Sequence, residues 1–313
     1  MKMTQMSLFK EIETDNHIAE SYTDIYAMHK YWSKKPYNII RDFILRYTRE
    51  GELVLDPFCG SGIAIVESIF SGRKSIGIDI NPIAVFITKQ MLNKVSTKHL
   101  ENEFKNLEKE CKGKIDNLYV VKRNGKEFTG THFLWNNGNL TEIWYTTGQT
   151  RAKKIIEKPT DEDIKLASSF SYDKIPFYYP KRNFFQNSRI NAKRQSKLYE
   201  LFTPRNLYAL SFLLDRIEKV KDENIREILK FCFTSCVGQA SKMVFVVKKR
   251  GKFNGKSRQQ ERKEVGSWVI GYWVPKENFE INVWNCFENR YRKILKAKRK
   301  QENLNYQIEE TDN

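Results

Sequence analysis

The sequence predicts an α/β fold of the Rossmann-like, nucleotide-binding type, and three features in one short stretch predict it. An apolar segment, 53–56, leads into a glycine-containing turn over 56–62. An expected helix then carries the chain back to a second apolar segment, 74–79, which ends on the carboxylate of Asp79. This order of strand, turn, helix and strand forms half of a nucleotide-binding sheet, in which ligands bind at the carboxyl ends of the parallel strands.

The glycine turn and Asp79 together indicate the kind of ligand. Gly60 and Gly62 allow turn dihedrals that other residues resist, and they let the backbone approach a ligand closely. Asp79 follows at close to the roughly 20-residue spacing at which an acid ending the second strand reaches ribose hydroxyls. The dinucleotide fingerprint has a third glycine where this chain has Ile65. The pattern therefore favours a nucleoside that lacks a tightly held pyrophosphate.

The segment Asp56-Pro-Phe-Cys-Gly-Ser-Gly62 resembles the cofactor motif of S-adenosylmethionine-dependent DNA methyltransferases that modify exocyclic amino groups. The segment His29-Lys-Tyr-Trp-Ser-Lys-Lys-Pro36, followed by a helix through 41–47, resembles what precedes this motif in those enzymes. The resemblance is strongest over 25–95 and more diffuse over 202–244. It implies a methyltransferase sheet, S-adenosylmethionine as cofactor and DNA as substrate, with adenine N6 preferred over cytosine N4 as the target.

The resemblance also implies the residues of a cofactor site. Asp56 is expected at the methionine end of the cofactor, with Phe58 packed beside it and Asp79 on the ribose. Lys34 and Lys35 lie either near the cofactor carboxylate or a DNA phosphate, or on an ordinary solvated face. The expected cofactor-binding residues are Asp56, Pro57, Phe58, Cys59, Gly60, Ser61, Gly62, Asp79, Ile80, Asn81 and Lys35.

The second motif of the family, an Asp, Asn or Ser followed by Pro-Pro and an aromatic residue, is missing. In the family this motif binds the amino group and stacks on the flipped base. No proline of the sequence has this context. The segment 174–180 has aromatic residues without the leading acceptor, so it is either a degenerate target pocket or a structured loop. We therefore expect no catalytic residue in this chain and place the catalytic motif in a partner chain.

The number of strands leads to the same expectation. A sheet of this class needs about five or more parallel strands, and the sequence indicates only 53–56 and 74–79. The segments 242–248 and 267–274 are rich in branched and aromatic residues, and they predict a hairpin around the basic loop 250–264. A half-built sheet has an open edge and an uncovered face. The sequence thus predicts an incomplete methyltransferase sheet that a second methyltransferase subunit completes.

Four segments are expected along the chain. Residues 1–100 form the cofactor-binding half, and 101–201 an inserted α+β or β-rich module for DNA recognition. Residues 202–300 return to the core with a helix, the hairpin, its basic loop and a basic helix at 289–301, and 301–313 form a polar tail.

Local signals place two further turns and the start of a helix. Asn124-Gly125 predicts a tight hairpin turn between strands at 118–121 and 126–128, and Trp135-Asn-Asn-Gly-Asn predicts another turn. Thr203-Pro204 predicts a helix start, because threonine is a good N-cap and proline suits the first helical position. On this helix Arg205 is the residue suspected of more than packing.

The charge favours a polyanionic partner. Lys and Arg number 55 against 38 Asp and Glu, for a net charge of +17, which favours DNA; the alternative is lysine excess from an AT-rich genome. Basic and aromatic residues alternate over 172–187, typical of nucleic-acid contact or of the core of a small β domain. The loop 250–263 is either a second segment that contacts DNA or a segment that becomes ordered only when it binds DNA. The expected DNA-binding residues are Lys181, Arg182, Arg189, Lys193, Arg194, Lys252, Lys256, Arg258 and Arg262.

The remaining side chains add little chemistry. The five cysteines lack the spacing of a metal site, Cys232 and Cys236 are expected to pack as small apolar residues, and Cys59 is expected as a turn residue. His29 lies either at the cofactor mouth or in a structural hydrogen bond. No apolar run reaches the roughly 18 residues of a membrane span, so we expect a cytoplasmic protein.

The sequence therefore predicts the S-adenosylmethionine-binding subunit of a two-chain amino-group DNA methyltransferase from a restriction-modification or anti-phage system. Two alternatives stay open. One is a catalytically inactive DNA-binding module with the methyltransferase fold, and the other is a self-sufficient nucleic-acid methyltransferase with a divergent base pocket.

Overall fold

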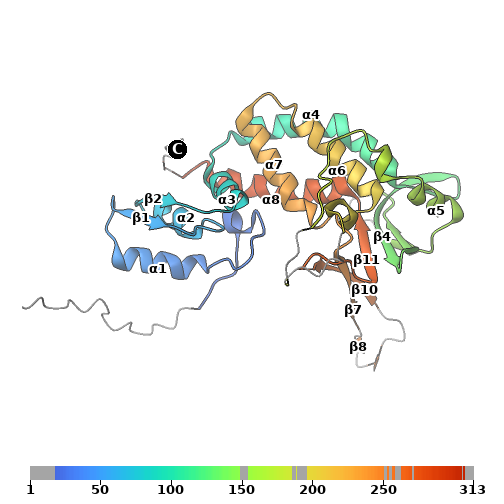
Figure 1. The fold of residues 1–313 in the computed structure, drawn as a ribbon, viewed down its shortest axis with the longest axis horizontal. Helices are drawn as coiled ribbons and strands as arrows, with labels where there is room; N and C mark the ends of the chain where they lie inside the picture. The colour runs from blue at the N-terminus through green and yellow to red at the C-terminus, as the bar shows by residue number, and fades with distance from the viewer. Residues whose placement is uncertain are drawn as a thin grey trace, which may run out of the picture. The chain divides into compact units, whose positions relative to one another are not determined.

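The computed structural model describes residues 18–148, 154–184, 188, 196–249, 252–253, 256–257, 262–269, 271–304 and 306. The chain has a mixed α/β structure and forms two compact units. Figure 1 shows its helices and strands, coloured by residue number from blue to red. The first unit is Met1–Asn93 with Leu304–Asn313, and the second is Lys94–Asn303. The borders expected at residues 101 and 201 both fall inside the second unit. Within the described ranges, no helix has the length and apolarity needed to cross a membrane.

The first unit is built around a pair of parallel strands. Its elements are η1 (Asp24–Ala27), α1 (Tyr37–Tyr47), β1 (Leu53–Asp56), α2 (Ile63–Phe70), β2 (Lys74–Gly77) and α3 (Pro82–Leu92). β1 pairs with β2 in parallel, with Asp56 opposite Gly77, and α2 packs against both strands. The two strands predicted here are confirmed, although β2 ends at Gly77 rather than at residue 79. Tyr306 of the expected tail also belongs to this unit, and its hydroxyl donates to the carbonyl of Leu92 at 2.8 Å.

A buried acid ties the segment before α1 to the helices. Glu67 of α2 is fully buried, and it accepts a hydrogen bond from the hydroxyl of Tyr26 and another from Arg41 Nε at 2.6 Å. Tyr26 in turn stacks on Tyr37 with 4.4 Å between ring centres. Because a buried carboxylate is tolerated only when it is paired and hydrogen-bonded, these partners fix residues 26–41 against α2.

The second unit combines an antiparallel sheet with helices. Its elements are α4 (Thr97–Asp116), η2 (Asn117–Tyr119), β3 (Val120–Arg123), β4 (Lys126–Asn136), β5 (Asn139–Tyr145), β6 (Ile155–Glu157), α5 (Asp161–Ser168), η3 (Tyr172–Lys174), η4 (Leu198–Leu201), α6 (Pro204–Ile217), α7 (Glu223–Val237), β7 (Val244–Lys249), β8 (Lys252–Phe253), β9 (Lys256–Ser257), β10 (Arg262–Trp268), β11 (Glu277–Ile281) and α8 (Val283–Gln301). The main sheet has the strand order β10-β7-β11-β4-β5-β6, and β3 pairs with β4.

Two Asn-Gly turns shape this sheet. Asn124 and Gly125, between β3 and β4, have φ angles of 51° and 72°, and Asn137 and Gly138, between β4 and β5, have 50° and 82°. Two successive positive φ angles are the requirement of a type I′ hairpin turn, which asparagine and glycine meet with little strain. The predicted hairpin at 124–125 and the turn at 135–139 are confirmed.

The predicted hairpin further along is confirmed as a pairing of β7 with β10, but its second strand was placed wrongly. β10 spans Arg262–Trp268, whereas the sequence indicated 267–274. Gly271 and Tyr272, just beyond β10, have positive φ angles. The strand begins with the charged residues Arg262, Lys263 and Glu264, which the composition of the sequence did not indicate as a strand. β11 was not predicted at all, yet it pairs with both β4 and β7 in the middle of the sheet.

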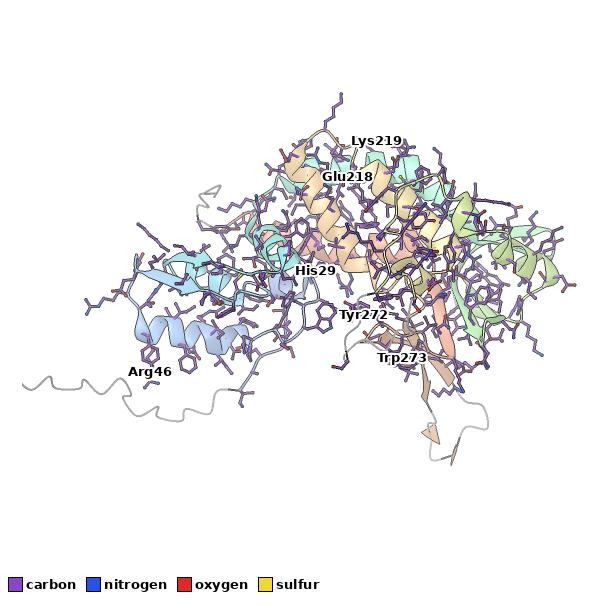
Figure 2. All side chains as sticks on the ribbon, viewed as in Figure 1. His29, Arg46, Glu218, Lys219, Tyr272 and Trp273 are labelled. Carbon is purple, nitrogen blue, oxygen red and sulfur yellow. The ribbon has the colours of Figure 1, made fainter. Side chains whose placement is uncertain are left out.

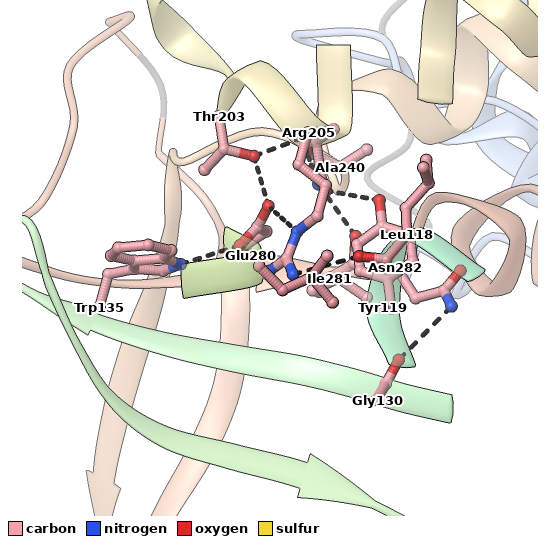
Figure 3. Close-up of polar contacts among 12 residues, drawn as sticks. Leu118, Tyr119, Gly130, Trp135, Thr203, Arg205, Ala240, Glu280, Ile281 and Asn282 are labelled. Carbon is pink, nitrogen blue, oxygen red and sulfur yellow. Dashed lines mark hydrogen bonds and ion pairs between the residues drawn. The ribbon is translucent and has the colours of Figure 1, made fainter. Parts of the chain in front are cut away.

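A buried ion pair joins α6 to β11 (Figure 3). Arg205 and Glu280 are each 1% exposed, and Arg205 Nη2 lies 2.5 Å from Glu280 Oε2. Glu280 also accepts hydrogen bonds from Trp135 Nε1 at 3.0 Å and from the hydroxyl of Thr203. Thr203 caps α6 as predicted, since its hydroxyl accepts from the amide of Asn206 at 3.1 Å. Beyond packing, Arg205 thus neutralises the buried carboxylate of Glu280 inside the second unit.

The expected basic helix at 289–301 is the second part of α8, and one of its faces is buried. Tyr291 stacks on Phe104 of α4 with 3.5 Å between ring centres. Lys298 is 1% exposed, and its amine donates to Gln301 Oε1 at 2.8 Å. Burial lowers the pKa of Lys298 to about 7. This lysine therefore belongs to the interior and is not available to a polyanion.

Replacing Lys298 with methionine is expected to change how stability depends on pH. The pKa of Lys298 is about 7 in the folded chain and about 10.4 in an unfolded one. Between these values the unfolded state binds more protons, so this lysine makes stability rise with pH. Lys298→Met should make the rise in urea midpoint from about pH 7 to about pH 9 smaller than in the wild type. Lys296→Met, at an exposed position of the same helix, is the control. An equal rise in Lys298→Met and the wild type would contradict the assignment.

Candidate cofactor site

The glycine loop, residues 56–62, connects β1 to α2 and is held against the end of β2. The amide of Ile78 donates to the carbonyl of Asp56 at 2.9 Å, and the amide of Cys59 donates to the carbonyl of Ile78 at 2.9 Å. Within the loop the amide of Gly62 donates to the carbonyl of Cys59 at 2.7 Å. These bonds continue the strand pairing past its end, so the loop has a defined position beside the carboxyl ends of both strands.

Neighbouring side chains make glycine necessary at two positions of the loop. Gly60 and Gly62 have φ angles of 50° and 74°, in the left-handed region that favours glycine. A Cβ atom at Gly62 would lie 2.4 Å from Thr88 Oγ1, and one at Gly60 would lie 3.2 Å from the ring of Tyr31. Neither neighbour was predicted from the sequence. Tyr31 falls in the segment 29–36 that resembles the family, which was the available signal, whereas nothing in the sequence pointed to Thr88.

The carboxylate of Asp79 links the end of β2 to the loop. Its Oδ2 accepts from the amide of Gly60 at 2.8 Å, and its Oδ1 accepts from the amide of Asn81 at 2.8 Å. Asp56 Oδ1 likewise accepts from the amide of Phe58 at 3.1 Å. A carboxylate has about four acceptor sites, so Asp79 keeps capacity for further donors such as ribose hydroxyls. Two acids that are separated by a helix in sequence thus lie at the same end of the strand pair.

Apolar side chains stand exposed beside these acids. Phe58 is 86% exposed and Ile80 is 100% exposed. Asn81 caps α3, because its side chain accepts from the amide of Ile83 at 3.3 Å, while Pro57 is exposed and Ser61 is buried in the loop. The site therefore offers both carboxylate acceptors and an apolar surface, which suits the ribose and the ring of a nucleoside.

The lysines and the histidine before α1 differ in their surroundings. The amine of Lys34 donates to the carbonyls of Tyr26 and His29, both at 2.7 Å, and burial lowers its pKa to about 8. His29, labelled in Figure 2, has its Nδ1 2.7 Å from the carbonyl of Lys30. Lys34 is thus engaged in holding its own segment, and Lys35 is the exposed member of the lysine pair.

Cys59 is placed as a turn residue. Its side chain is buried and lies 3.9 Å from Thr88 Oγ1. Burial raises the pKa of the thiol, which opposes formation of the thiolate that a nucleophile requires. Cys232 and Cys236 are buried as well, as expected for small apolar residues.

The expected DNA-binding residues lie in the second unit, and the structure describes some of them. Lys181 and Arg182 are exposed, and the amine of Lys181 lies 5.2 Å from the ring centre of Tyr179. The backbones of Lys252, Lys256 and Arg262 lie on β8, β9 and β10, but their side chains fall outside the described part. Arg189, Lys193, Arg194 and Arg258 lie outside the described residues altogether.

The segment that carries the glycine loop was compared with known protein families. Residues 9–90 match the family model for N6/N4 methyltransferases, described as a DNA methylase. This segment of the chain is therefore similar to the DNA methylase family. The methylase segment contains the glycine loop, Asp79 and the segment 29–36, so the predicted resemblance to amino-group DNA methyltransferases is confirmed.

Several curated relatives of the methylase segment and its surroundings are type II methyltransferases. The chain is 27% identical over 212 residues to M.MjaII of Methanocaldococcus jannaschii, covering 65% of this chain and 38% of that protein. It is 29% identical over 143 residues to M.HpaI of Haemophilus parainfluenzae, covering 43% and 41%. It is 43% identical over 68 residues to M2.LlaDCHI of Lactococcus lactis subsp. cremoris, covering 22% and 25%. The chain thus spans about two fifths or less of these relatives, and no solved structure matches it.

Proposed function

We propose that this chain binds S-adenosylmethionine at the carboxyl ends of β1 and β2 and serves in methylation of an amino group of DNA, adenine N6 in preference to cytosine N4. The observation that supports this best is the Asp79 carboxylate, held 2.8 Å from the amide of Gly60 inside the methylase segment. In the proposed complex Asp79 binds the ribose hydroxyls, and Asp56 and Lys35 meet the methionine end. Phe58 and Ile80 pack on the nucleoside.

The described residues suit direct transfer. Bound S-adenosylmethionine supplies an electrophilic methyl group to an amino nitrogen of an extruded base. Asp79 and the loop amides orient the nucleoside, and the exposed Phe58 shields its ring from water. Cys59 takes no part as a nucleophile, because burial raises its pKa. No covalent link to this chain is needed at any point.

An exposed apolar face on the strand pair supports a completing partner. Its side chains are between 48% and 57% exposed: Leu53, Leu55, Ile76 and Ile78. Leu55 lies opposite Ile76 in the parallel register, so both side chains point to the same face. The other face is covered by α2, whose Ile65 would lie 2.9 Å from a Cβ atom at Gly77. Among the described residues this sheet has two strands, fewer than the about five parallel strands that a nucleotide-binding sheet of this class needs.

We assign this face to a second methyltransferase subunit that adds strands and a covering layer. The same subunit supplies the missing base-binding motif and the catalytic residues. The net charge of +17 supports DNA as the shared ligand, with Lys181, Arg182, Arg189, Lys193, Arg194, Lys252, Lys256, Arg258 and Arg262 as its contacts. The names of the relatives as type II methyltransferases support a place in a restriction-modification or anti-phage system.

The test is reconstitution of methyl transfer. The purified chain, a candidate partner chosen as the product of a neighbouring gene that encodes an Asp-Pro-Pro-Tyr-type motif, and their mixture are each assayed for labelled methyl transfer from S-adenosylmethionine to DNA. Transfer is expected in the mixture alone. Leu55→Glu, which puts a charge on the exposed face, should abolish transfer, while Leu45→Glu on the exposed part of α1 should not.

The alternatives give different results in the same assay. Transfer by the chain alone would establish a self-sufficient methyltransferase and overturn the two-chain proposal. DNA binding without transfer in any mixture, together with no binding of S-adenosylmethionine, would establish a catalytically inactive recognition module.

A further inference from the structure

A cavity of about 530 Å³ lies in the second unit, next to Pro204 at the start of α6. Its wall combines aromatic, basic and acidic side chains, among them Tyr172, Asp173, Tyr179, Lys181, Lys197 and Tyr199. We call it the tyrosine pocket. The volume falls in the range of about 300–1,000 Å³ that small-molecule sites occupy.

The three tyrosine rings are held in place before any ligand binds. The ring centres of Tyr172 and Tyr199 are 4.8 Å apart, and those of Tyr179 and Tyr199 are 5.5 Å apart with near-perpendicular planes. The hydroxyl of Tyr172 donates to the carbonyl of Phe202 at 2.7 Å, and that of Tyr179 donates to the carbonyl of Tyr172 at 2.8 Å. Because these side chains are already ordered, a stacked ligand costs little additional conformational entropy.

Two lysines border the same aromatic wall. The amine of Lys181 lies 5.2 Å from the ring centre of Tyr179, and that of Lys197 lies 5.6 Å from the ring centre of Tyr199. The two lysines belong to neighbouring antiparallel segments, which a bridge between Asn183 and Lys197 joins. Positive charge is therefore available beside two of the three rings.

Asp173 makes the pocket unlike a simple anion site. It lines the same cavity and is exposed, so its carboxylate is accessible to a ligand. A carboxylate repels a bare phosphate but accepts hydrogen bonds from the exocyclic amino and ring N–H groups of a base. Aromatic faces, a hydrogen-bond acceptor and flanking amines are together the requirements of a nucleotide whose base has left the helical stack.

A second cavity of the same unit has a lining that differs from that of the tyrosine pocket. It has a volume of about 470 Å³ and lies at the α6–α7 corner, where Figure 2 labels Glu218 and Lys219. Its described lining residues include no phenylalanine, tyrosine or tryptophan, and two of its basic side chains lie close to acids: His99 Nδ1 lies 3.5 Å from Asp222, and Lys219 lies 2.8 Å from Asp215. This cavity lacks a stacking surface.

We propose that the tyrosine pocket binds one unstacked nucleotide of the DNA, with the base against Tyr172, Tyr179 and Tyr199 and the adjoining phosphates on Lys181 and Lys197. This inference rests on the proposed function, because DNA is the proposed substrate. It adds a base-holding site within the second unit of this chain.

The test compares two fluorescent duplexes of equal length in anisotropy titrations of the full chain. One is perfectly paired, and the other has a single unpaired adenine. The unpaired adenine is expected to raise affinity by about 5-fold to about 100-fold, the effect of stacking one base. Tyr199→Leu should remove this preference, and Tyr199→Phe should retain it because the ring is kept.

The lysines give an independent measurement that does not depend on the rings. Replacing Lys181 and Lys197 with alanine should lower the slope of log affinity against log salt by about 2. The matched control replaces Lys122 and Lys126 of the β3–β4 hairpin. Equal affinity for the two duplexes, or loss of the preference in Tyr199→Phe as well as Tyr199→Leu, would overturn the pocket.

The two proposals fail in distinguishable ways. Binding of the paired duplex without preference for the unpaired adenine overturns the pocket and leaves the proposed function. Failure to bind either duplex overturns the pocket and also the proposed DNA role, while calorimetry with S-adenosylmethionine tests the cofactor role separately.

Discussion

Replacing Asp79 with alanine is expected to lower the affinity of this chain for S-adenosylmethionine by at least about 100-fold. A hydrogen bond to a charged group contributes about 1.5–3 kcal/mol, and a carboxylate that binds both ribose hydroxyls makes two such bonds. A loss of about 3 kcal/mol corresponds to about 100-fold in the dissociation constant. The amide of Gly60, which donates to Asp79 Oδ2 at 2.8 Å, loses its partner in the same variant.

Isothermal titration calorimetry of the full chain measures this effect. Glu127→Ala serves as control, because it removes the same charge from an exposed pair with Lys122 in the second unit, and its affinity should match the wild type. Asp79→Asn keeps one acceptor but turns an amino group toward backbone amides, so we expect intermediate affinity. An affinity of Asp79→Ala within about 2-fold of the wild type would exclude Asp79 from the cofactor site.

Replacing Glu280 with alanine is expected to destabilise the second unit by about 3–5 kcal/mol, the cost of breaking a buried ion pair from one side. Arg205 is 1% exposed, and in the variant its guanidinium stays charged without a carboxylate. The guanidinium also lies 4.1 Å from the ring centre of Phe133 and 4.8 Å from that of Tyr119. Those rings stabilise the guanidinium charge less than a carboxylate does. We therefore expect most of the loss of stability to remain.

Urea unfolding followed by tryptophan fluorescence measures this loss. Every tryptophan except Trp32 lies in the second unit, so the signal reports mainly on that unit. The double variant Arg205→Met with Glu280→Leu should recover much of the stability, because it leaves no unpaired buried charge. Recovery should be incomplete, since Trp135 and Thr203 still lose their acceptor. A loss of less than about 1 kcal/mol in Glu280→Ala, similar to a surface substitution, would contradict the role of the pair.

The elements that sequence analysis predicted well depend on near neighbours in the chain. The turn at Asn124-Gly125 needs two positive φ angles, and the start of α6 needs Thr203 to cap its own first turn. The glycine loop and Asp79 belong to one strand–helix–strand unit, so their spacing alone placed them together. The family of residues 9–90 followed from the same short stretch.

The sequence by itself thus determined the glycine loop, its acid, the tight turns and the resemblance to DNA methylases, because each is encoded within a few tens of residues. Only the tertiary structure decided the position of β11 between β4 and β7 and the end of β10. It also decided that Thr88 packs against Gly62 and Tyr31 against Gly60. It also decided that Arg205 pairs with Glu280. The physical reason is that pairing partners and burial far along the chain are fixed by packing, which no local pattern of residues records.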